Sequence, residues 1–221
     1  MKLTPHIDTH PPAKKAPADS AAPFVPEKRT YNALATAAEG CRGCELYKHA
    51  TQVVFGEGAT KASLILLGEQ PGDAEDLAGH PFVGPAGRLL DKALEEAGIP
   101  RKEVYVTNAV KHFRFEERGK RRLHKSPSAR HIKACRPWLE AELDLVQPAA
   151  LICLGATAAK AVLGNKFSLT KSLGEWQAGP RNSKVLATFH PSAALRAPDH
   201  DRREELYREI VKTLKLAGSV I

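Results

Sequence analysis

Polar residues that can bind a base, carry a proton or stabilise an anion recur in four short segments of this 221-residue chain. The segments are GEQPG (68–72), TNAVKH (107–112), LGATAA (154–159) and HPSAALR (190–196). They supply a carboxylate, amides and imidazoles, the groups on which acid–base catalysis and anion stabilisation depend. Each segment is also compatible with an ordinary turn or helix cap when it is taken by itself.

The chain contains four cysteines, Cys41, Cys44, Cys135 and Cys153. Their spacing is C-x2-C, then 90 intervening residues, then C-x17-C. Thiolates from distant positions that meet in space usually hold a metal, although inert buried thiols are the alternative. A zinc ribbon would need a second C-x2-C pair, and a cytosolic protein would not form a disulfide framework.

Positive charge is concentrated in one segment. The whole chain carries +8, and residues 111–125 contribute +5 of it, from seven Lys and Arg against two Glu. Such a cluster attracts polyanions through phosphate contacts and counterion release. The alternative is a solvated surface loop.

The elements that must position these residues alternate between apolar runs and amphipathic stretches. We expect strands at 63–67, 104–109, 149–154 and 185–189, and helices at 86–97, 156–163 and about 199–217. Ser126 and Pro127 are expected to begin a further helix, which Pro137 would kink or restart. About sixteen residues after 109 show no periodicity, which is typical of a functional loop.

This alternation predicts an α/β fold: one domain with a central four-stranded parallel sheet flanked by helices. Each polar segment follows or ends a strand. Because ligands of open α/β sheets bind beyond the carboxyl ends of the strands, we expect the four segments to converge on one crevice.

Residues 1–28 are rich in Pro, Ala and Lys, and we expect them to form a disordered tail before a domain at 29–221. No apolar run approaches the ~18 residues of a membrane span, and the N-terminus lacks the apolar block of a signal peptide. We therefore expect a soluble, cytoplasmic protein without a membrane partner.

Several motifs resemble, in order and spacing, those of the iron–sulfur uracil-DNA glycosylases of family four. The resemblance spans about Cys41 to Ala217. It rests on GEQPGDAEDLAGHPFVGPAG (68–87), TNAVKH, ACRPWL (134–139), HPSAALR and the four cysteines. Gln70 and the insert KRRLH (120–124) resemble more narrowly the UdgX-type branch. Leu123 stands where that branch has Ile, and HPSAALR differs slightly from HPSSLLR.

The resemblance implies an enzyme that flips uracil out of DNA, or takes it from a single strand, and excises it. Phe82 would stack on the base, Asn108 would read its edge, and His190 would stabilise the departing anion. The implied uracil-binding residues are Gln70, Phe82, Asn108 and His190. The implied DNA-binding residues are Lys120, Arg121, Arg122 and Arg196.

In the UdgX-type branch a histidine of the basic insert lies near C1′ of the sugar, and here that residue is His124. With Glu69 polarising its imidazole, His124 would attack C1′ and end the reaction as a covalent adduct. A conventional multiple-turnover glycosylase is the alternative, with Glu69 or, less directly, Asp73, Glu75 or Asp76 activating water.

The resemblance further implies that Cys41, Cys44, Cys135 and Cys153 hold a structural 4Fe–4S cluster and that the protein is a monomer. A non-catalytic iron–sulfur DNA-binding module is a third reading. It predicts basic residues without a convergent Asn, His and carboxylate set.

Overall fold

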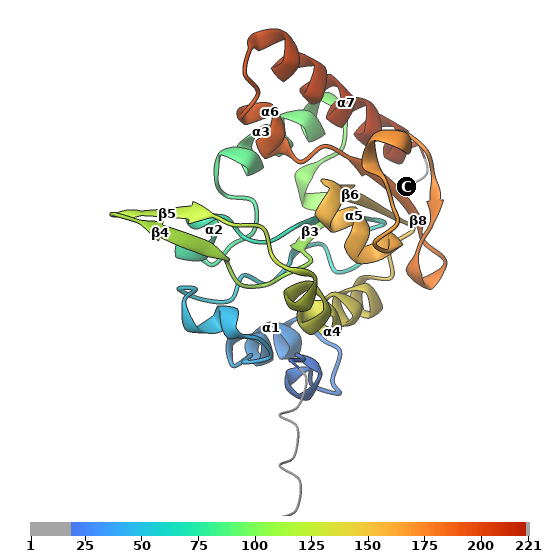
Figure 1. Ribbon diagram of the computed structural model, residues 1–221. Helices are drawn as coiled ribbons and strands as arrows, with labels where there is room; N and C mark the ends of the chain where they lie inside the picture. The colour runs from blue at the N-terminus through green and yellow to red at the C-terminus, as the bar shows by residue number, and fades with distance from the viewer. Residues whose placement is uncertain (1–18, 220–221) are drawn as a thin grey trace, which may run out of the picture.

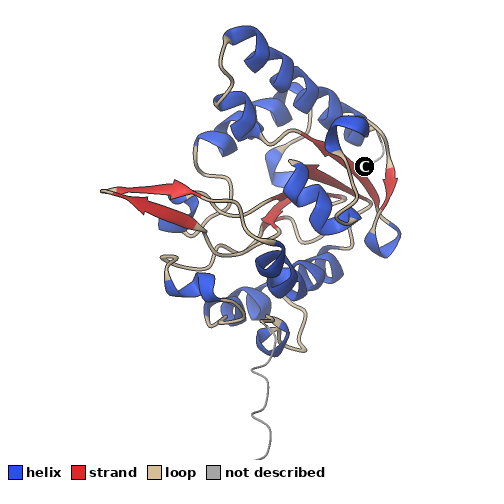
Figure 2. Ribbon diagram, in the orientation of Figure 1, coloured by secondary structure: helices blue, strands red, loops and turns tan. Residues whose placement is uncertain are grey.

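Four buried apolar segments pair side by side as strands at the centre of the molecule (Figure 2). The structure is a computed structural model that describes residues 19–219. The strands of the sheet are β1 (Glu57–Gly58), β2 (Leu64–Gly68), β3 (Val104–Asn108), β6 (Ala150–Leu154), β7 (Gln177–Ala178) and β8 (Lys184–Thr188). Their order is β1-β3-β2-β6-β8-β7. Near-continuous apolar sequence suits strands that are covered on both faces.

The sheet is mixed and larger than the predicted four strands. The central strands β3, β2, β6 and β8 are parallel, as expected. The two-residue strands β1 and β7 add antiparallel edges. Segments this short have no alternation of apolar and polar residues for sequence reasoning to detect.

Helices cover both faces of the sheet (Figure 1). Their bounds are α1 (Tyr31–Glu39), α2 (Asp73–Ala78), α3 (Pro85–Glu96), α4 (Ala129–Val146), α5 (Ala156–Leu163), α6 (Pro191–Leu195) and α7 (His200–Gly218). Short 3-10 helices span Ala22–Phe24, Glu45–Lys48, Arg101–Glu103, Leu169–Lys171 and Pro180–Asn182. Apolar residues of α3 and α7 pack on one face, and those of α4 and α5 pack on the other.

Helix α4 differs from its prediction in two respects. Its N-cap is Ser128, whose hydroxyl accepts the backbone N–H of His131, so the helix begins two residues later than expected. Pro137 lies inside the helix, which continues to Val146 without a restart. Pro137 costs the helix one backbone hydrogen bond. The burial of Trp138, Leu139 and Leu143 in the core offsets this loss.

The segment predicted to be a loop after β3 contains a β-hairpin. Strands β4 (Phe115–Arg118) and β5 (Arg121–His124) pair with each other and not with the central sheet. The hairpin projects beside α2 (Figure 1). Gly119, with φ of 61°, supplies the left-handed conformation that its tight turn requires.

The predicted disordered tail includes residues 19–28, but Asp19 and Ala21 of this segment contact α4 in the structure. Ala21 is buried, and its N–H donates to the carbonyl of Ala134. The remainder of the predicted tail, 1–18, lies outside the described residues. Within 19–219, no helix combines the length and apolar character needed to cross a membrane.

Candidate active site

The carboxyl ends of β2, β3, β6 and β8 open into one cavity of about 830 Å³. The polar segments after the four strands all contribute to its lining, so the predicted convergence is confirmed. The predicted site residues that line it are Glu69, Gln70, Phe82, Asn108, His124, His190 and Arg196. Lys120, Arg121 and Arg122 lie on the hairpin, outside the lining.

Asn108 presents an unused acceptor in this cavity. Its side chain is buried, and its Oδ1 has no hydrogen-bond partner among the described residues. An orphaned buried acceptor costs free energy unless a ligand supplies a donor. Gly68 makes room for it, because a Cβ there would lie 2.2 Å from Asn108 Oδ1 and 2.8 Å from Phe82 Cζ.

Phe82 is held in an unusual backbone conformation. Its φ is 58°, which is rare for a residue with a side chain. Gly87 permits this conformation, because a Cβ at that position would lie 1.7 Å from the carbonyl oxygen of Phe82. Strain of this kind is retained where the surrounding structure enforces it, often at binding sites. The Phe82 ring stacks near that of His190, at 6.1 Å between centroids.

Glu75 fixes the loops on either side of Phe82. One of its carboxylate oxygens accepts the N–H of Gly84 at 2.7 Å, and the other accepts the N–H of Gly72 at 3.1 Å. Both oxygens are therefore engaged by backbone. Glu75 is a positioning residue and not a free base, which removes it from the candidates for water activation.

His190 is held as one neutral tautomer. Its Nδ1 accepts the backbone N–H of Ser192 at 3.1 Å, and because an amide can only donate, Nδ1 carries no proton. Burial lowers the pKa of His190 to about 4, and the positive charge of Arg196 acts in the same direction. At neutral pH the ring is therefore uncharged and has Nε2–H available as a donor.

Glu69 and His124 lie next to each other in the lining of the cavity. Glu69 Oε1 lies 3.7 Å from His124 Nε2 and has no hydrogen-bond partner among the described residues. Burial lowers the pKa of His124, with Arg196 lowering it further and Glu69 opposing the shift. The geometry suits a neutral imidazole with a carboxylate positioned to accept its proton.

The remaining carboxylates near the cavity are occupied by Arg122. Its Nε lies 2.6 Å from Asp73 Oδ1, and its Nη1 lies 2.6 Å from Asp76 Oδ2. The guanidinium also lies over the rings of Phe113 and Phe115. Arg122 therefore anchors the hairpin to α2. It was predicted to contact DNA, but its charge is already paired with these two carboxylates.

The other cationic residues of the predicted DNA surface are free of such contacts. Lys120 and Arg121, at the hairpin tip, are exposed and form no ion pair within 19–219. Arg196 lines the cavity and acts electrostatically on both histidines. These three side chains are available to an anionic ligand.

Gln70 connects the hairpin to the GEQPG segment after β2. Its Nε2 donates to the carbonyls of Arg114 (3.0 Å) and Lys125 (3.2 Å), and its Oε1 accepts the N–H of Arg114. Arg114 and Lys125 flank β4 and β5. The Gln70 side chain therefore clamps both ends of the hairpin, which places His124 at the cavity.

Three of the four cysteines share one core cluster. Cys41 and Cys135 are members of it, and Cys44 packs against it. Trp138 Nε1–H donates to Cys41 Sγ at 3.2 Å, and Lys111 N–H donates to Cys135 Sγ at 3.3 Å, contacts that suit thiolate ligands. The three thiols therefore lie in the same part of the core.

Cys153 does not fit with them. It lies in β6 within the separate cluster between the sheet, α4 and α5. As the side chains stand, no three His, Cys, Asp or Glu residues of the described chain lie close enough together to hold a metal ion. The structure thus gives no support to Cys153 as the fourth ligand.

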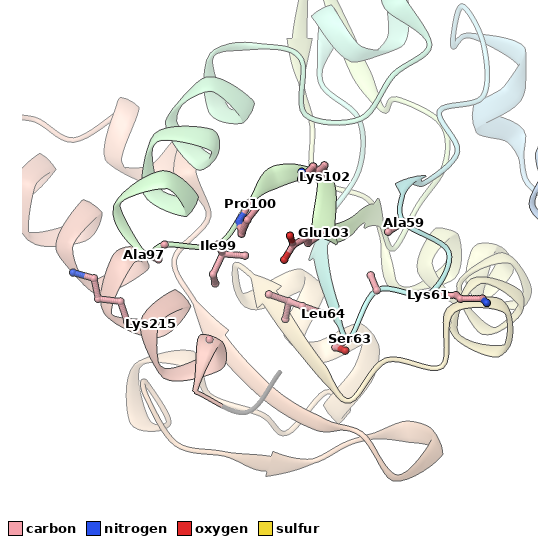
Figure 3. A pocket seen from close by; sticks show the side chains of 13 residues that line it. Ala59, Lys61, Ser63, Leu64, Ala97, Ile99, Pro100, Lys102, Glu103 and Lys215 are labelled. Atoms are coloured by element: carbon pink, nitrogen blue, oxygen red, sulfur yellow. The ribbon is translucent and has the colours of Figure 1, made fainter.

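A second cavity, of about 540 Å³, lies at the opposite, amino end of the strands. Figure 3 shows its lining from the segments before β2 and β3 and from the end of α7. Its charged residues, Lys61, Lys102, Glu103 and Lys215, are exposed. None of the buried polar atoms that lack a partner in the described chain lines it, so it is not a candidate active site.

Sequence reasoning missed Gly68 and Gly87, and it gave Glu75 and Arg122 other roles than the structure does. The glycines at 68 and 87, the backbone acceptor Glu75 and the anchor Arg122 all serve through contacts made by folding. Only the two glycines could have been noticed in the sequence, because Gly68 ends an apolar run and Gly87 lies in a predicted helix, where alanine is the more usual residue.

A family model described as the uracil DNA glycosylase superfamily matches residues 55–215. The type-4 uracil-DNA glycosylase of Thermotoga maritima is 38% identical over 82% of this chain and 89% of its own length. That of Sulfurisphaera tokodaii is 35% identical over 80% of both. A type-5 uracil-DNA glycosylase of Thermus thermophilus is 29% identical over 75% of this chain and 80% of its own length. With its four polar loops converging on one cavity, the chain belongs to the uracil-DNA glycosylase superfamily.

Proposed function

We propose that this enzyme excises uracil from DNA and finishes covalently attached to the sugar through His124. The observation that carries the excision step is the unpartnered Asn108 Oδ1 in a cavity that also contains the neutral donor His190. Uracil offers an N3–H to the first and O2 to the second. Cytosine lacks that N3–H and would leave the Asn108 acceptor unpaired, which a buried site rejects strongly.

Bond cleavage follows from where charge develops. The C1′–N1 bond breaks with its electron pair leaving on uracil, so that the base becomes anionic and the sugar cationic. His190 Nε2–H donates to the base at O2, and Phe82 holds its flat face. Arg196 adds positive charge near the departing anion. Donors fixed before the reaction stabilise such an anion without reorganisation.

Covalent capture uses the other side of the cavity. The His124 imidazole, uncharged at neutral pH, supplies an electron pair to C1′, and its ring proton passes to Glu69. The product is a neutral N-alkyl imidazole, which is a poor leaving group. A nitrogen held in contact outcompetes water through proximity. Gln70 and Arg122 support this step by fixing the hairpin.

A denaturing gel with an end-labelled uracil oligonucleotide tests both steps. Wild type should give a heat- and detergent-resistant shifted band. His124→Ser should give none, and should instead give strand cleavage after alkali, because water replaces the imidazole. His200→Ser, which changes an exposed histidine outside the cavity, is the matched control and should cross-link like wild type.

The outcomes separate the alternatives. Turnover by wild type without a shifted band would indicate a conventional glycosylase, in which Glu69 activates water. Neither cleavage nor a shift would indicate a DNA-binding module. A His124→Ser variant unable to release uracil would assign His124 to bond cleavage.

We also propose a structural iron–sulfur cluster, 4Fe–4S in kind, bound by Cys41, Cys44 and Cys135, and iron analysis of cysteine variants decides whether Cys153 is the fourth ligand. Bound there, it would tie the N-terminal segment to α4. None of the four cysteines forms a disulfide within the described chain, and we propose a cytoplasmic location. We also propose that the protein acts as a monomer.

A further inference from the structure

A buried ion pair lies directly behind Asn108. Lys111 follows β3, Glu142 lies on α4, and Lys111 Nζ donates to Glu142 Oε2 at 2.5 Å. The two side chains are 1% and 0% exposed. Neither residue lines the active-site cavity.

The pair is the centre of a hydrogen-bond network that reaches three parts of the chain. Glu142 Oε1 accepts the N–H of Gly56 at 3.0 Å and the hydroxyl of Tyr105 at 3.2 Å. The hydroxyl of Thr107 lies between the two charges, 2.9 Å from Glu142 Oε1 and 2.5 Å from Lys111 Nζ. The carboxylate therefore uses several partners at once, as a buried charge requires.

The lysine end of this network holds Asn108. Lys111 Nζ donates to the backbone carbonyl of Asn108 at 2.9 Å. Asn108 is also paired in register with Gly68 across β2 and β3. The backbone of Asn108 is thus fixed from the sheet and from behind, while its Oδ1 is left unpartnered in the cavity.

A buried ion pair contributes little net stability, because desolvation offsets most of the attraction. The contacts of this pair point to a different role. We propose that Lys111 and Glu142 are positioning residues that hold Asn108 at the distance from which it reads the base, with Thr107 joining the two. The inference rests on the proposed reading of uracil by Asn108.

The test removes both charges together, so that no unpaired charge remains buried. In Lys111→Met/Glu142→Gln, the glutamine keeps an acceptor for Gly56 and Tyr105, while Asn108 loses its donor. We expect a cooperatively folded protein whose single-turnover rate of uracil release falls at least about tenfold, since small misplacements of a reading group are costly. The matched control, Arg136→Met/Glu140→Gln, changes an exposed pair on the same helix and should keep the wild-type rate.

A double-mutant cycle with Asn108→Ala distinguishes positioning from general weakening. If the pair acts through Asn108, the Lys111→Met/Glu142→Gln change should slow the Asn108→Ala protein less than about twofold, because coupled residues are non-additive. Thr107→Val, which removes only the bridging hydroxyl, should show the same pattern on a smaller scale. It provides the measurement if the charge-free pair does not fold.

Two results would overturn the inference. A wild-type rate for Lys111→Met/Glu142→Gln would show that Asn108 needs no such support. If that variant does not fold, a wild-type rate for Thr107→Val would show the same. An equal loss with and without Asn108 would show that the pair acts elsewhere. If Asn108→Ala itself excised uracil normally, the proposed base reading would fall as well, whereas a slow Asn108→Ala with a fast pair variant would refute the positioning role alone.

Discussion

Gly68→Ala should disable base recognition by adding one methyl group. Gly68 is the last residue of β2 and pairs in register with Asn108. A Cβ there would lie 2.2 Å from Asn108 Oδ1 and 2.8 Å from Phe82 Cζ. The same atom would therefore press on the residue proposed to read the base and on the ring proposed to stack on it.

The required displacement gives the size of the effect. Ordinary contacts begin at 3.4 Å, so Asn108 Oδ1 must retreat by about 3.4 − 2.2 = 1.2 Å and Phe82 Cζ by about 3.4 − 2.8 = 0.6 Å. Misplacement of a reacting or binding group by about 1 Å can cost ~10²-fold in rate. Gly68 does not have a positive φ, so alanine is compatible with its backbone and the fold should persist.

Single-turnover release of uracil from a labelled oligonucleotide measures this loss, with circular dichroism as the check on folding. Gly40→Ala is the control, because its Cβ would meet only the carbonyl of Ala37, at 3.7 Å. We expect a rate about 10²-fold below wild type for Gly68→Ala and no change for Gly40→Ala. A folded Gly68→Ala protein within threefold of wild type would refute the assignment of Asn108 and Phe82 to base recognition.

Three further predictions concern the hairpin, the thiols and pH. Removing Lys120 and Arg121 should weaken DNA binding and flatten its dependence on salt. Arg122→Met should leave this salt dependence unchanged and reduce cross-linking, because Arg122 anchors the hairpin. Equal salt effects in the two variants would contradict the distinction. Iron analysis should show loss of iron in Cys135→Ala and wild-type iron in Cys153→Ala, and loss in both would make Cys153 a ligand. Because burial places the pKa of His124 below its usual 6.5, the neutral nucleophile persists to lower pH. The cross-linking rate should therefore fall to half its maximum below pH 6.5, and a half-maximal rate above pH 6.5 would contradict it.

The central strands were predictable because each is a buried apolar run followed by polar residues. Ala150–Leu154 is one such run, and an apolar segment this short between polar residues is typical of a buried strand of a parallel sheet. The placement of the polar segments followed from the same logic, since parallel strands end at one edge. Sequence thus predicted both the cavity and most of its lining.

What the sequence did not predict depends on tertiary pairing. Arg122 reads as one of seven similar cations, and only the approach of α2 distinguishes it. The four cysteines read as one set, but α4 and β6 present Cys135 and Cys153 to different parts of the core. The hairpin lacks a buried face, so its strands show no apolar alternation.

Attachment of the hairpin at two points divides the enzyme into separable parts. The residues proposed to read the base belong to the sheet ends, whereas the proposed nucleophile arrives on an arm held by Gln70 and by the Asp73–Arg122–Asp76 contacts. Loosening the arm would leave a chain that still reads uracil but releases its product. On the proposed mechanism, covalent attachment to DNA and ordinary turnover would therefore differ in how the hairpin is held, and not in the pocket that reads the base.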